Sequence, residues 1–166
     1  MIPAYISIGS NMGERLDNCR RGIDGLLADG RSCLLAASPF YRTSPVDYVD
    51  QDWFVNAVVK IETELDPFEL LDSLGRIEKA AGRVAHAIRF GPRVLDLDII
   101  FFADQIIETD NLIIPHPRMH KRRFVLKPIC DIDPSIKHPL LGKEMRSLLA
   151  GLQDDEQRVL KICRSY

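Results

Sequence analysis

Apolar segments of two different periods alternate over the first 103 residues of the chain. In chain order they predict a strand, a helix, two strands, a helix and a strand, over residues 4–8, 16–27, 33–41, 54–64, 67–81 and 94–103. The helical stretches repeat their apolar residues every three or four positions, and the second begins with Asp66-Pro67, an N-cap residue followed by proline. A long polar connection, residues 42–53, separates the two middle strands.

This element order restricts the fold to few architectures. A β-α-β-β-α-β chain is the ferredoxin-like split motif, an antiparallel sheet with two helices on one face. We therefore expect an α+β fold in which residues 1–166 form one domain. A turn at Asp104-Gln105 predicts a hairpin whose return strand includes Ile106 and Ile107, and two further helices are expected over 118–126 and 144–152.

Charge and hydropathy exclude several classes of protein. The chain has 22 Lys and Arg against 24 Asp and Glu, a net charge of −2, which argues against a general nucleic-acid binder or a polybasic membrane protein. The longest apolar run, residues 99–103, is far shorter than the ~20 residues that cross a bilayer. The first residues also lack the features of a signal peptide. We expect a cytoplasmic monomer that acts on small molecules and binds neither nucleic acid nor membrane.

The cysteines give no sign of a metal site. Cys19, Cys33, Cys130 and Cys163 are widely spaced, with no Cys-x-x-Cys pair and no histidine at zinc-finger spacing. We expect reduced thiols that are mostly buried, as free cysteines usually are.

The near-neutral net charge conceals a segregation of charge between residues 79 and 130. Residues 79–95 contain four basic side chains and no acid, residues 96–110 contain five acids and no Lys or Arg, and residues 111–130 contain five basic side chains and no acid. If the central block is a strand and hairpin, the nine basic residues flank one sheet edge and can converge on a polyanion. The alternative for any one of them is solvated surface charge. The nine are Lys79, Arg83, Arg89, Arg93, Arg118, Lys121, Arg122, Arg123 and Lys127.

Two aspartates lie in the central block at strand spacing. Residues i and i+2 of a strand point to the same face, ~6–7 Å apart, so Asp96 and Asp98 can meet around hard cations while Leu97 faces the core. Two carboxylates on an apolar strand need a neutralising partner. That partner is either Arg93, in a salt bridge, or a divalent metal. Oxygen ligands of this kind suit Mg²⁺, which completes its shell with water and substrate phosphates.

Metal-bound carboxylates beside several arginines are typical of phosphoryl transfer. The sequence therefore favours an ATP-dependent transferase. Residues 25–32 match the spacing of a Walker loop superficially, but they close a helix and enter a strand, whereas a phosphate loop follows a strand and opens a helix. We expect side chains, and not a glycine-rich loop, to hold ATP.

Aromatic residues suggest a place for a second substrate. Trp53 and Phe54 begin a strand, and Phe124 follows the second basic cluster, so two rings could enclose a flat heterocycle. A buried Asn56 could read the edge of that ring, because an amide both donates and accepts hydrogen bonds. The simpler interpretation is that these aromatic side chains belong to the core.

These residues together resemble the 6-hydroxymethyl-7,8-dihydropterin pyrophosphokinase family of folate biosynthesis. The most specific stretch is RFGPRVLDLDI over residues 89–99. Further matching stretches are residues 4–11 (AYISIGSN), 40–45 (FYRTSP), 54–57 (FVNA), 76–78 with 82–83, 115–117 (PHP) and 122–124 (RRF).

The resemblance implies transfer of the terminal diphosphate of ATP to the pterin hydroxymethyl group, with release of AMP. By that analogy Asp96 and Asp98 would bind two Mg²⁺, and Arg83 and Arg93 would stabilise the migrating diphosphate. The ATP contacts would be Glu78, Arg89, Ile99, His116 and Arg122. The pterin contacts would be Thr43, Val46, Phe54, Asn56 and Phe124.

The chain departs from the family pattern at several nucleotide-contact positions. Members often have Gln at Gly75, Arg at Ala85, Trp at Phe90, Arg at Asn111 and Thr at Ile113. We therefore expect looser nucleotide binding than in relatives that keep both arginines. Two alternatives stay open on the residues alone: another Mg²⁺-dependent nucleotide transferase, or an RNA-binding or regulatory module, on the same scaffold.

Overall fold

The computed structural model describes residues 1–82, 91–153, 156–163 and 166. Its sheet strands are β1 (Ile2–Ser10), β2 (Ser32–Ala37), β3 (Phe40–Thr43), β4 (Phe54–Thr63), β5 (Asp96–Phe102) and β8 (Val159–Cys163). A separate two-stranded ribbon consists of β6 (Ile107–Glu108) and β7 (Ile113–Ile114). The helices are α1 (Arg15–Leu27), α2 (Pro67–Ala80), the 3₁₀ turn η1 (Met119–Lys121), α3 (Arg123–Ile132) and α4 (Met145–Ala150).

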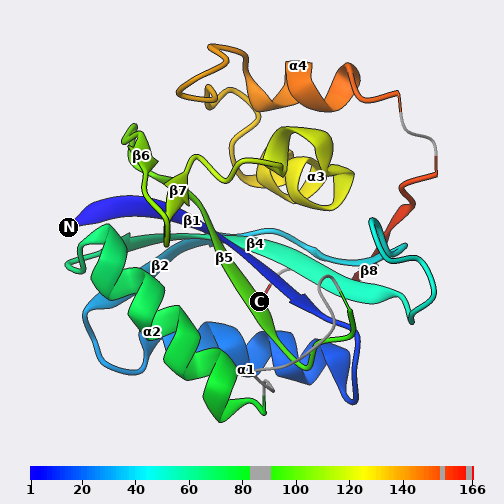
Figure 1. Cartoon of the computed structure of the whole chain (residues 1–166), viewed down its shortest axis with the longest axis horizontal. Helices are drawn as coiled ribbons and strands as arrows, with labels where there is room; N and C mark the ends of the chain where they lie inside the picture. The colour runs from blue at the N-terminus through cyan, green and yellow to red at the C-terminus, as the bar shows by residue number, and fades with distance from the viewer. Residues whose placement is uncertain (83–90, 154–155, 164–165) are drawn as a thin grey trace.

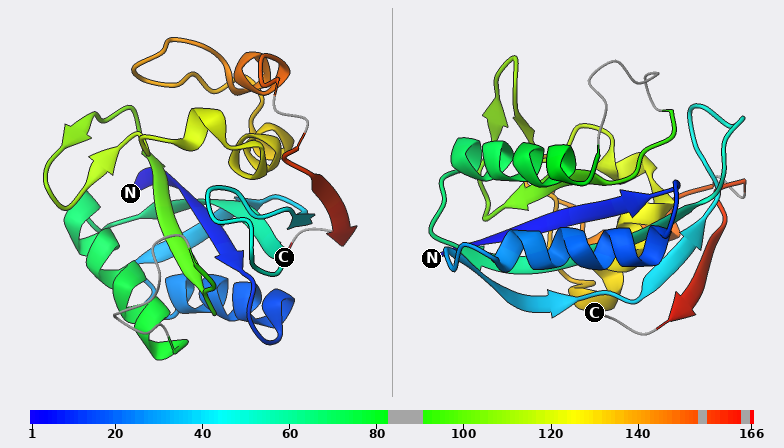
Figure 2. Two further views of the ribbon diagram at one scale, coloured as in Figure 1. Left: turned by 45° about the vertical axis from the view of Figure 1, so that its right-hand side comes forward. Right: turned by 90° about the horizontal axis from the view of Figure 1, so that it is seen from below.

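The main sheet is antiparallel, with strands in the order β5-β1-β4-β3-β8 and β2 paired to the other half of β4. Helices α1 and α2 cover one face, and α3 and α4 lie over the other (Figures 1 and 2). The core elements β1, α1, β2–β4, α2 and β5 reproduce the predicted ferredoxin-like order, so the α+β prediction is confirmed. None of the helices in the described ranges is long and apolar enough to cross a membrane.

Strand alternation divides the apolar side chains between two cores. Val58 and Val59 are neighbours on β4, yet Val59 packs under α1 and α2 with Ile8, while Val58 packs under α3 with Ile129. This follows from the period of two, which turns successive side chains to opposite faces. The second core requires a cover on the far face of the sheet, which the C-terminal helices supply.

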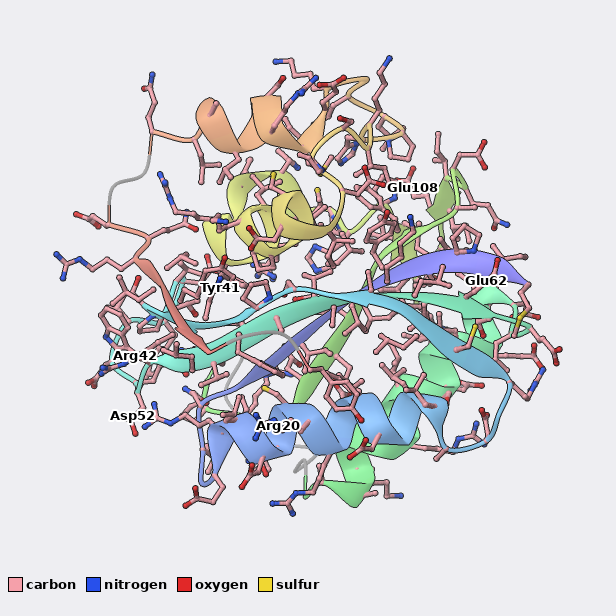
Figure 3. All side chains as sticks on the ribbon, turned by 180° about the vertical axis from the view of Figure 1, so that it is seen from behind. Arg20, Tyr41, Arg42, Asp52, Glu62 and Glu108 are labelled. Carbon is pink, nitrogen blue, oxygen red and sulfur yellow. The ribbon has the colours of Figure 1, made fainter. Side chains whose placement is uncertain are left out.

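Two tyrosines on the sheet anchor α3. The hydroxyl of Tyr5 on β1 donates to Asp133 over 3.1 Å, and the hydroxyl of Tyr41 on β3 donates to Asp131. Tyr41 accordingly lies between the sheet and α3 (Figure 3). Both carboxylates sit at the C-terminal end of the helix, so α3 is held against β1 and β3 at once.

Helix α2 begins as its sequence predicts. The Asp66 carboxylate accepts hydrogen bonds from the backbone N–H groups of Phe68 and Glu69, and Glu69 accepts in return from the Asp66 N–H. This capping box, with Pro67 at the first helical position, satisfies amide groups that would otherwise have no partner.

The predicted strand 33–41 is wrong as a single element. Ser38 and Pro39 interrupt it, giving β2 and β3, which both pair with β4. Pro39 has no N–H to donate to a ladder, and the Ser38 hydroxyl instead accepts a hydrogen bond from the Val58 N–H. The C-terminal strand β8, which completes the sheet beside β3, was not expected.

The predicted hairpin partner of β5 is also wrong. The chain does turn after Phe102, but β6 pairs with β7 and not with β5. After this ribbon the backbone forms a hydrogen bond with β5 at His116, whose N–H donates to the Ile100 carbonyl over 3.1 Å. A local turn signal shows where the chain reverses but does not show which strands then pair. The helices predicted over 118–126 and 144–152 are observed with shifted bounds, as η1 with α3 and as α4.

The cysteine prediction holds only in part. The described thiols of Cys19, Cys33 and Cys130 are free, but Cys19 alone is buried, while Cys33 is exposed and Cys130 is half-buried. Burial raises the pKa of the Cys19 thiol to about 12, so this thiol stays protonated at neutral pH.

Asn11 joins three segments that border the same end of the sheet. Its backbone N–H donates to the Arg93 carbonyl over 3.0 Å, and its side-chain oxygen accepts from the Arg93 N–H over 2.8 Å. Its amide nitrogen donates to the Gln51 side chain over 2.9 Å and to the Asp52 carbonyl over 3.0 Å. The side chain is buried. Asn11 therefore fixes the loop before β4 and the loop before β5 to the end of β1.

Replacing Asn11 with alanine should destabilise the fold by about 2 kcal/mol, because the Arg93 N–H and the Asp52 carbonyl lose their hydrogen bonds to a buried side chain. Urea unfolding followed by circular dichroism measures this loss. Asn111→Ala, at an exposed asparagine, serves as the control and should change stability by less than about 0.5 kcal/mol. Equal stability of the two variants would contradict the role assigned to Asn11.

Candidate active site

A cleft of about 260 Å³ opens at the end of the sheet where β1, β4 and β5 meet the loop between β3 and β4. Segments from five parts of the chain line it, including the polar connection after β3 and the turn that leads into α3. It lies on the sheet face that carries α3, because its residue Asn56 alternates with Val55, which belongs to the opposite core.

One row of the sheet spans the floor of this cleft. Gly9 on β1 pairs with Asp96 on β5 on one side and with Asn56 on β4 on the other. Laterally paired residues point to the same face, so the carboxylate and the amide project into one space. Gly9 leaves that space open, because a Cβ at this position would lie 2.6 Å from the Asn56 Oδ1 atom.

The two aspartates occupy the positions that strand spacing predicts. Asp96 and Asp98 both line the cleft, while Leu97 between them is buried in the core beneath α1 and α2. The guanidinium Nη1 of Arg93 forms a salt bridge with Asp96 over 3.0 Å. The arginine partner considered from the sequence is therefore present, and both side chains remain at the cleft wall.

Glu78 holds the strand that carries these aspartates. Its carboxylate, on α2, is buried and accepts a hydrogen bond from the Leu97 N–H over 2.8 Å. It does not belong to the cleft lining. The structure thus places Glu78 behind β5, where it covers the open edge of the strand between the two aspartates.

The basic residues converge only in part. Of the nine in the two acid-free blocks, Arg93, Arg118 and Arg122 line the cleft. Lys127 lies away from it, in a salt bridge with Asp131. Arg83 and Arg89, to which the resemblance assigns phosphate and ATP contacts, lie outside the described residues.

His116 stands beside the arginines at the cleft wall. Its Nδ1 atom accepts a hydrogen bond from the Arg118 N–H over 3.2 Å. Burial, reinforced by the positive charges of Arg122 and Arg118, lowers the pKa of His116 from 6.5 to about 4. The imidazole is therefore neutral at pH 7, with its proton on Nε2 because Nδ1 acts as an acceptor.

The five residues expected to contact the pterin all line the cleft: Thr43, Val46, Phe54, Asn56 and Phe124. Asn56 is buried, and its amide nitrogen donates to the Thr43 hydroxyl over 2.6 Å. This bond fixes the amide, so that Oδ1 stands over the Gly9 backbone. The guanidinium of Arg122 lies 5.4 Å from the centroid of the Phe124 ring. The arrangement can bind a flat, partly polar ring next to an anion.

A second hollow of about 240 Å³ adjoins the first on the far side of β5. Ile99 lines it, and Asp98 and His116 border both spaces. Asn111 and Ile113, two positions where the chain departs from the family pattern, lie in its wall. Gly75 lies in α2 with open space around it, and Ala85 and Phe90 lie outside the described residues.

Several cleft residues were missed from the sequence. Ser7, Gly9, Asp47 and Gln51 line the space without having been singled out, and Arg118 was noted only as part of a basic block. The alternation of β1 places Ser7 and Gly9 on one face, but the spacing within β1 does not show which side chains of the neighbouring strands lie beside them. Asp47 and Gln51 sit in an irregular loop, where spacing carries no geometric information.

The donor set suits a metal that is completed by substrate. No group of three or more His, Cys, Asp or Glu side chains gathers anywhere in the described ranges in a way that could hold an ion by itself. Two adjacent carboxylates facing a cleft are instead the ligands that Mg²⁺ uses when phosphates and water fill its remaining positions. The residues present therefore fit Mg²⁺ better than a structural metal.

Comparison with known proteins gives a consistent result. The profile of the 7,8-dihydro-6-hydroxymethylpterin-pyrophosphokinase family matches residues 5–134. The chain is 45% identical over 141 residues to 2-amino-4-hydroxy-6-hydroxymethyldihydropteridine pyrophosphokinase of Bacillus subtilis, covering 85% of this chain and 84% of that protein. The Haemophilus influenzae protein of the same name is 42% identical over 139 residues, covering 84% of this chain and 86% of that one.

Longer proteins contain the same unit. The folic acid synthesis protein fol1 of Pneumocystis carinii is 42% identical over 152 residues, which cover 92% of this chain but 20% of that protein. The wild-type HPPK-DHPS of Plasmodium falciparum with pteroate superposes with a TM-score of 0.70 at 16% identity, covering 90% of this chain and 42% of that one. This second likeness concerns the fold alone. With the cleft geometry and the match over residues 5–134, the conclusion is that the chain belongs to the 7,8-dihydro-6-hydroxymethylpterin-pyrophosphokinase family.

Proposed function

We propose that this protein transfers the terminal diphosphate of ATP to the hydroxymethyl group of 6-hydroxymethyl-7,8-dihydropterin, giving the pterin diphosphate and AMP. Family membership supports the reaction class, pyrophosphoryl transfer in folate biosynthesis with ATP as co-substrate. The observation that carries the assignment to this cleft is the sheet row Asp96–Gly9–Asn56, which brings a carboxylate and a buried amide to opposite sides of one open position.

The Asn56 side of the row would bind the pterin. The Thr43 hydroxyl fixes the Asn56 amide, and Gly9 leaves room beside its oxygen, so this oxygen can accept from a ring N–H without rearrangement. Phe54, Phe124 and Val46 supply apolar surface around it. A bicyclic heterocycle in this place would present its substituent toward Asp96 and Asp98.

The Asp96 side would bind Mg²⁺ and the phosphates. Asp96 and Asp98 would hold the metal, two ions by analogy with the family, and the metal would neutralise phosphate charge and acidify the attacking hydroxyl. Arg93 pairs with Asp96 in the ligand-free protein and can turn its remaining donors to the diphosphate. Arg83 would assist from the segment outside the described residues.

ATP would extend from this end across β5. Ile99 lines the second hollow and would contact the nucleoside, and His116 and Arg122 border the phosphate path. Neutral His116 can donate from Nε2 to a phosphate oxygen. We assign Glu78 an indirect role, because its carboxylate holds the Leu97 backbone and thereby positions both aspartates. Arg89 completes the proposed ATP set.

The remaining expectations stay proposals. We propose that residues 1–166 act as one pyrophosphokinase domain, monomeric and cytoplasmic, with the two small substrates as partners. The extent of the family match supports the first point, since residues 5–134 already contain the whole cleft. A different Mg²⁺-dependent transferase or an RNA-binding module is disfavoured by family membership and by the carboxylate pair that would repel RNA.

Incubation with ATP, Mg²⁺ and 6-hydroxymethyl-7,8-dihydropterin should yield AMP and the pterin diphosphate in equal amounts. Chromatography of the nucleotides separates the hypotheses, because an ordinary kinase would release ADP. Omitting the pterin is the control and should leave ATP intact. ADP as the product, or AMP formed without pterin, would contradict the proposal.

Asp98→Ala should lower kcat/KM by at least about 100-fold, because it removes one of the two carboxylates proposed to hold Mg²⁺. Steady-state AMP formation over a range of Mg²⁺ concentrations measures the effect. Asp104→Ala, at an exposed acid after the end of β5, is the matched control and should retain wild-type activity. If the Asp98 variant kept activity within a few-fold while remaining folded, the metal assignment would be wrong.

His116 should make the folded protein less stable as the pH falls from about 6.5 to about 4. In this window the unfolded chain binds a proton at His116 and the folded chain does not, so the free energy of unfolding decreases by roughly 1.4 kcal/mol per pH unit. Urea unfolding of wild type and His116→Gln at several pH values measures the difference. The difference in free energy of unfolding between the two proteins should be constant above pH 7 and should change below it. A difference that stays constant at lower pH would contradict the lowered pKa of His116.

A further inference from the structure

Asp47 adopts a backbone conformation that is uncommon for its residue type. Its φ angle is +66°, in the left-handed region, and it forms the centre of a three-residue turn closed by the Tyr48 N–H and the Val46 carbonyl over 2.8 Å. A positive φ at the centre of such a turn is the rarer and more strained of the two γ-turn forms. Strain of this kind persists only where surrounding contacts hold it in place.

The contacts that hold Asp47 come from two arginines. Its Oδ2 atom accepts a hydrogen bond from Arg118 Nη1 over 3.2 Å and lies 3.5 Å from Arg122 Nη2. All three side chains line the main cleft, in which Asp96 and Asp98 also lie. The loop between β3 and β4 is thus attached to the turn before α3 through one carboxylate oxygen.

The two neighbouring guanidinium groups of Arg118 and Arg122 favour a bound anion. The Arg122 side chain is only 13% exposed. Burial and the neighbouring Arg118 guanidinium lower the pKa of Arg122, and the charges of Asp98 and Asp47 act in the opposite direction. Two like charges so placed attract any available negative group, and a phosphate has more charge and more acceptor oxygens than a carboxylate.

We propose that Arg118 binds nucleotide phosphate together with Arg122, and that the Asp47 carboxylate occupies this arginine pair in the ligand-free protein and competes with the incoming phosphate. The inference rests on the proposed function, because it takes the polyphosphate of ATP as the competing anion. Displacement of Asp47 also releases the strained turn, so the loop before β4 changes conformation when the nucleotide binds. Asp47 in this way sets the affinity of the cleft for ATP.

Asp47→Asn isolates the charge. Asparagine has the same shape and tolerates a positive φ, so the substitution removes the ion pair without adding steric strain. Asp50→Asn is the matched control, because it removes one charge from an exposed side chain of the same loop. The probe is α,β-methylene-ATP with Mg²⁺, whose methylene bridge replaces the bond that the proposed reaction breaks, and binding is measured by titration calorimetry without pterin.

Asp47→Asn should bind the probe about two- to fivefold more tightly than Asp50→Asn, as expected when a partly exposed ion pair no longer has to be broken. Arg118→Gln should bind it more weakly, and in the Arg118→Gln background the gain from Asp47→Asn should shrink. Equal affinity of the two aspartate variants would overturn the competition. Weaker binding by Asp47→Asn would also overturn it, because the carboxylate would then orient the arginines for the ligand.

Trp53 provides a second readout that does not depend on affinity. It is the only tryptophan of the chain and lies at the end of the same loop, with the Arg42 guanidinium 4.9 Å from its ring centroid. Binding of the probe should change its emission, and ligand-free Asp47→Asn should already show part of that change. Identical ligand-free spectra for wild type and Asp47→Asn would contradict displacement of the loop.

The two proposals fail in distinguishable ways. If AMP and pterin diphosphate form but Asp47→Asn and Asp50→Asn bind the probe alike, only the competition by Asp47 is wrong. If no AMP forms and wild type does not bind the probe, the proposed function fails and the inference fails with it.

Discussion

The pairing of β1 with β5 is the constraint on which the site depends. It places Gly9 opposite Asp96 while β4 places Asn56 on the other side of the same glycine. Because paired residues face the same side of a sheet, the proposed metal ligand and the proposed pterin ligand are separated by one residue without a side chain. The Glu78 carboxylate fixes the opposite edge of β5 through the Leu97 N–H, so the strand is held from both sides.

Several charged side chains of the cleft form ion pairs, and in each pair a group of the substrate could replace one partner. Arg93 is bound to Asp96, and Arg118 and Arg122 are bound to Asp47, so much of the positive charge at the cleft is balanced before ATP arrives. Such pairing lowers the cost of holding guanidinium groups close together in a partly buried place. When a polyphosphate binds with Mg²⁺, the arginines would exchange their carboxylate partners for phosphate. The substrate would therefore replace existing ion pairs and would not bind to uncompensated positive charge.

Local patterns predicted most elements but few of their pairings. Asp66-Pro67 and the helical repeat gave the start of α2 within a residue, since capping depends on neighbours in the chain. The β5 hairpin was wrong because a turn at Asp104 does not determine which strand pairs with which. Ser38-Pro39 interrupts one predicted strand through a missing N–H. The strand β8 is stabilised mainly by its pairing with β3, a distant partner, and local propensity did not predict it.

The sequence by itself determined that Asp96 and Asp98 share a face, because a period of two is a property of the strand alone. It also determined the family, because each family motif is a short run of consecutive residues. Only the tertiary structure decided which basic residues reach the aspartates, that Gly9 must lack a side chain and that Asp47 lies on Arg118 and Arg122. Those relations join residues far apart in the chain, and they depend on strand order and loop closure, which no local spacing encodes.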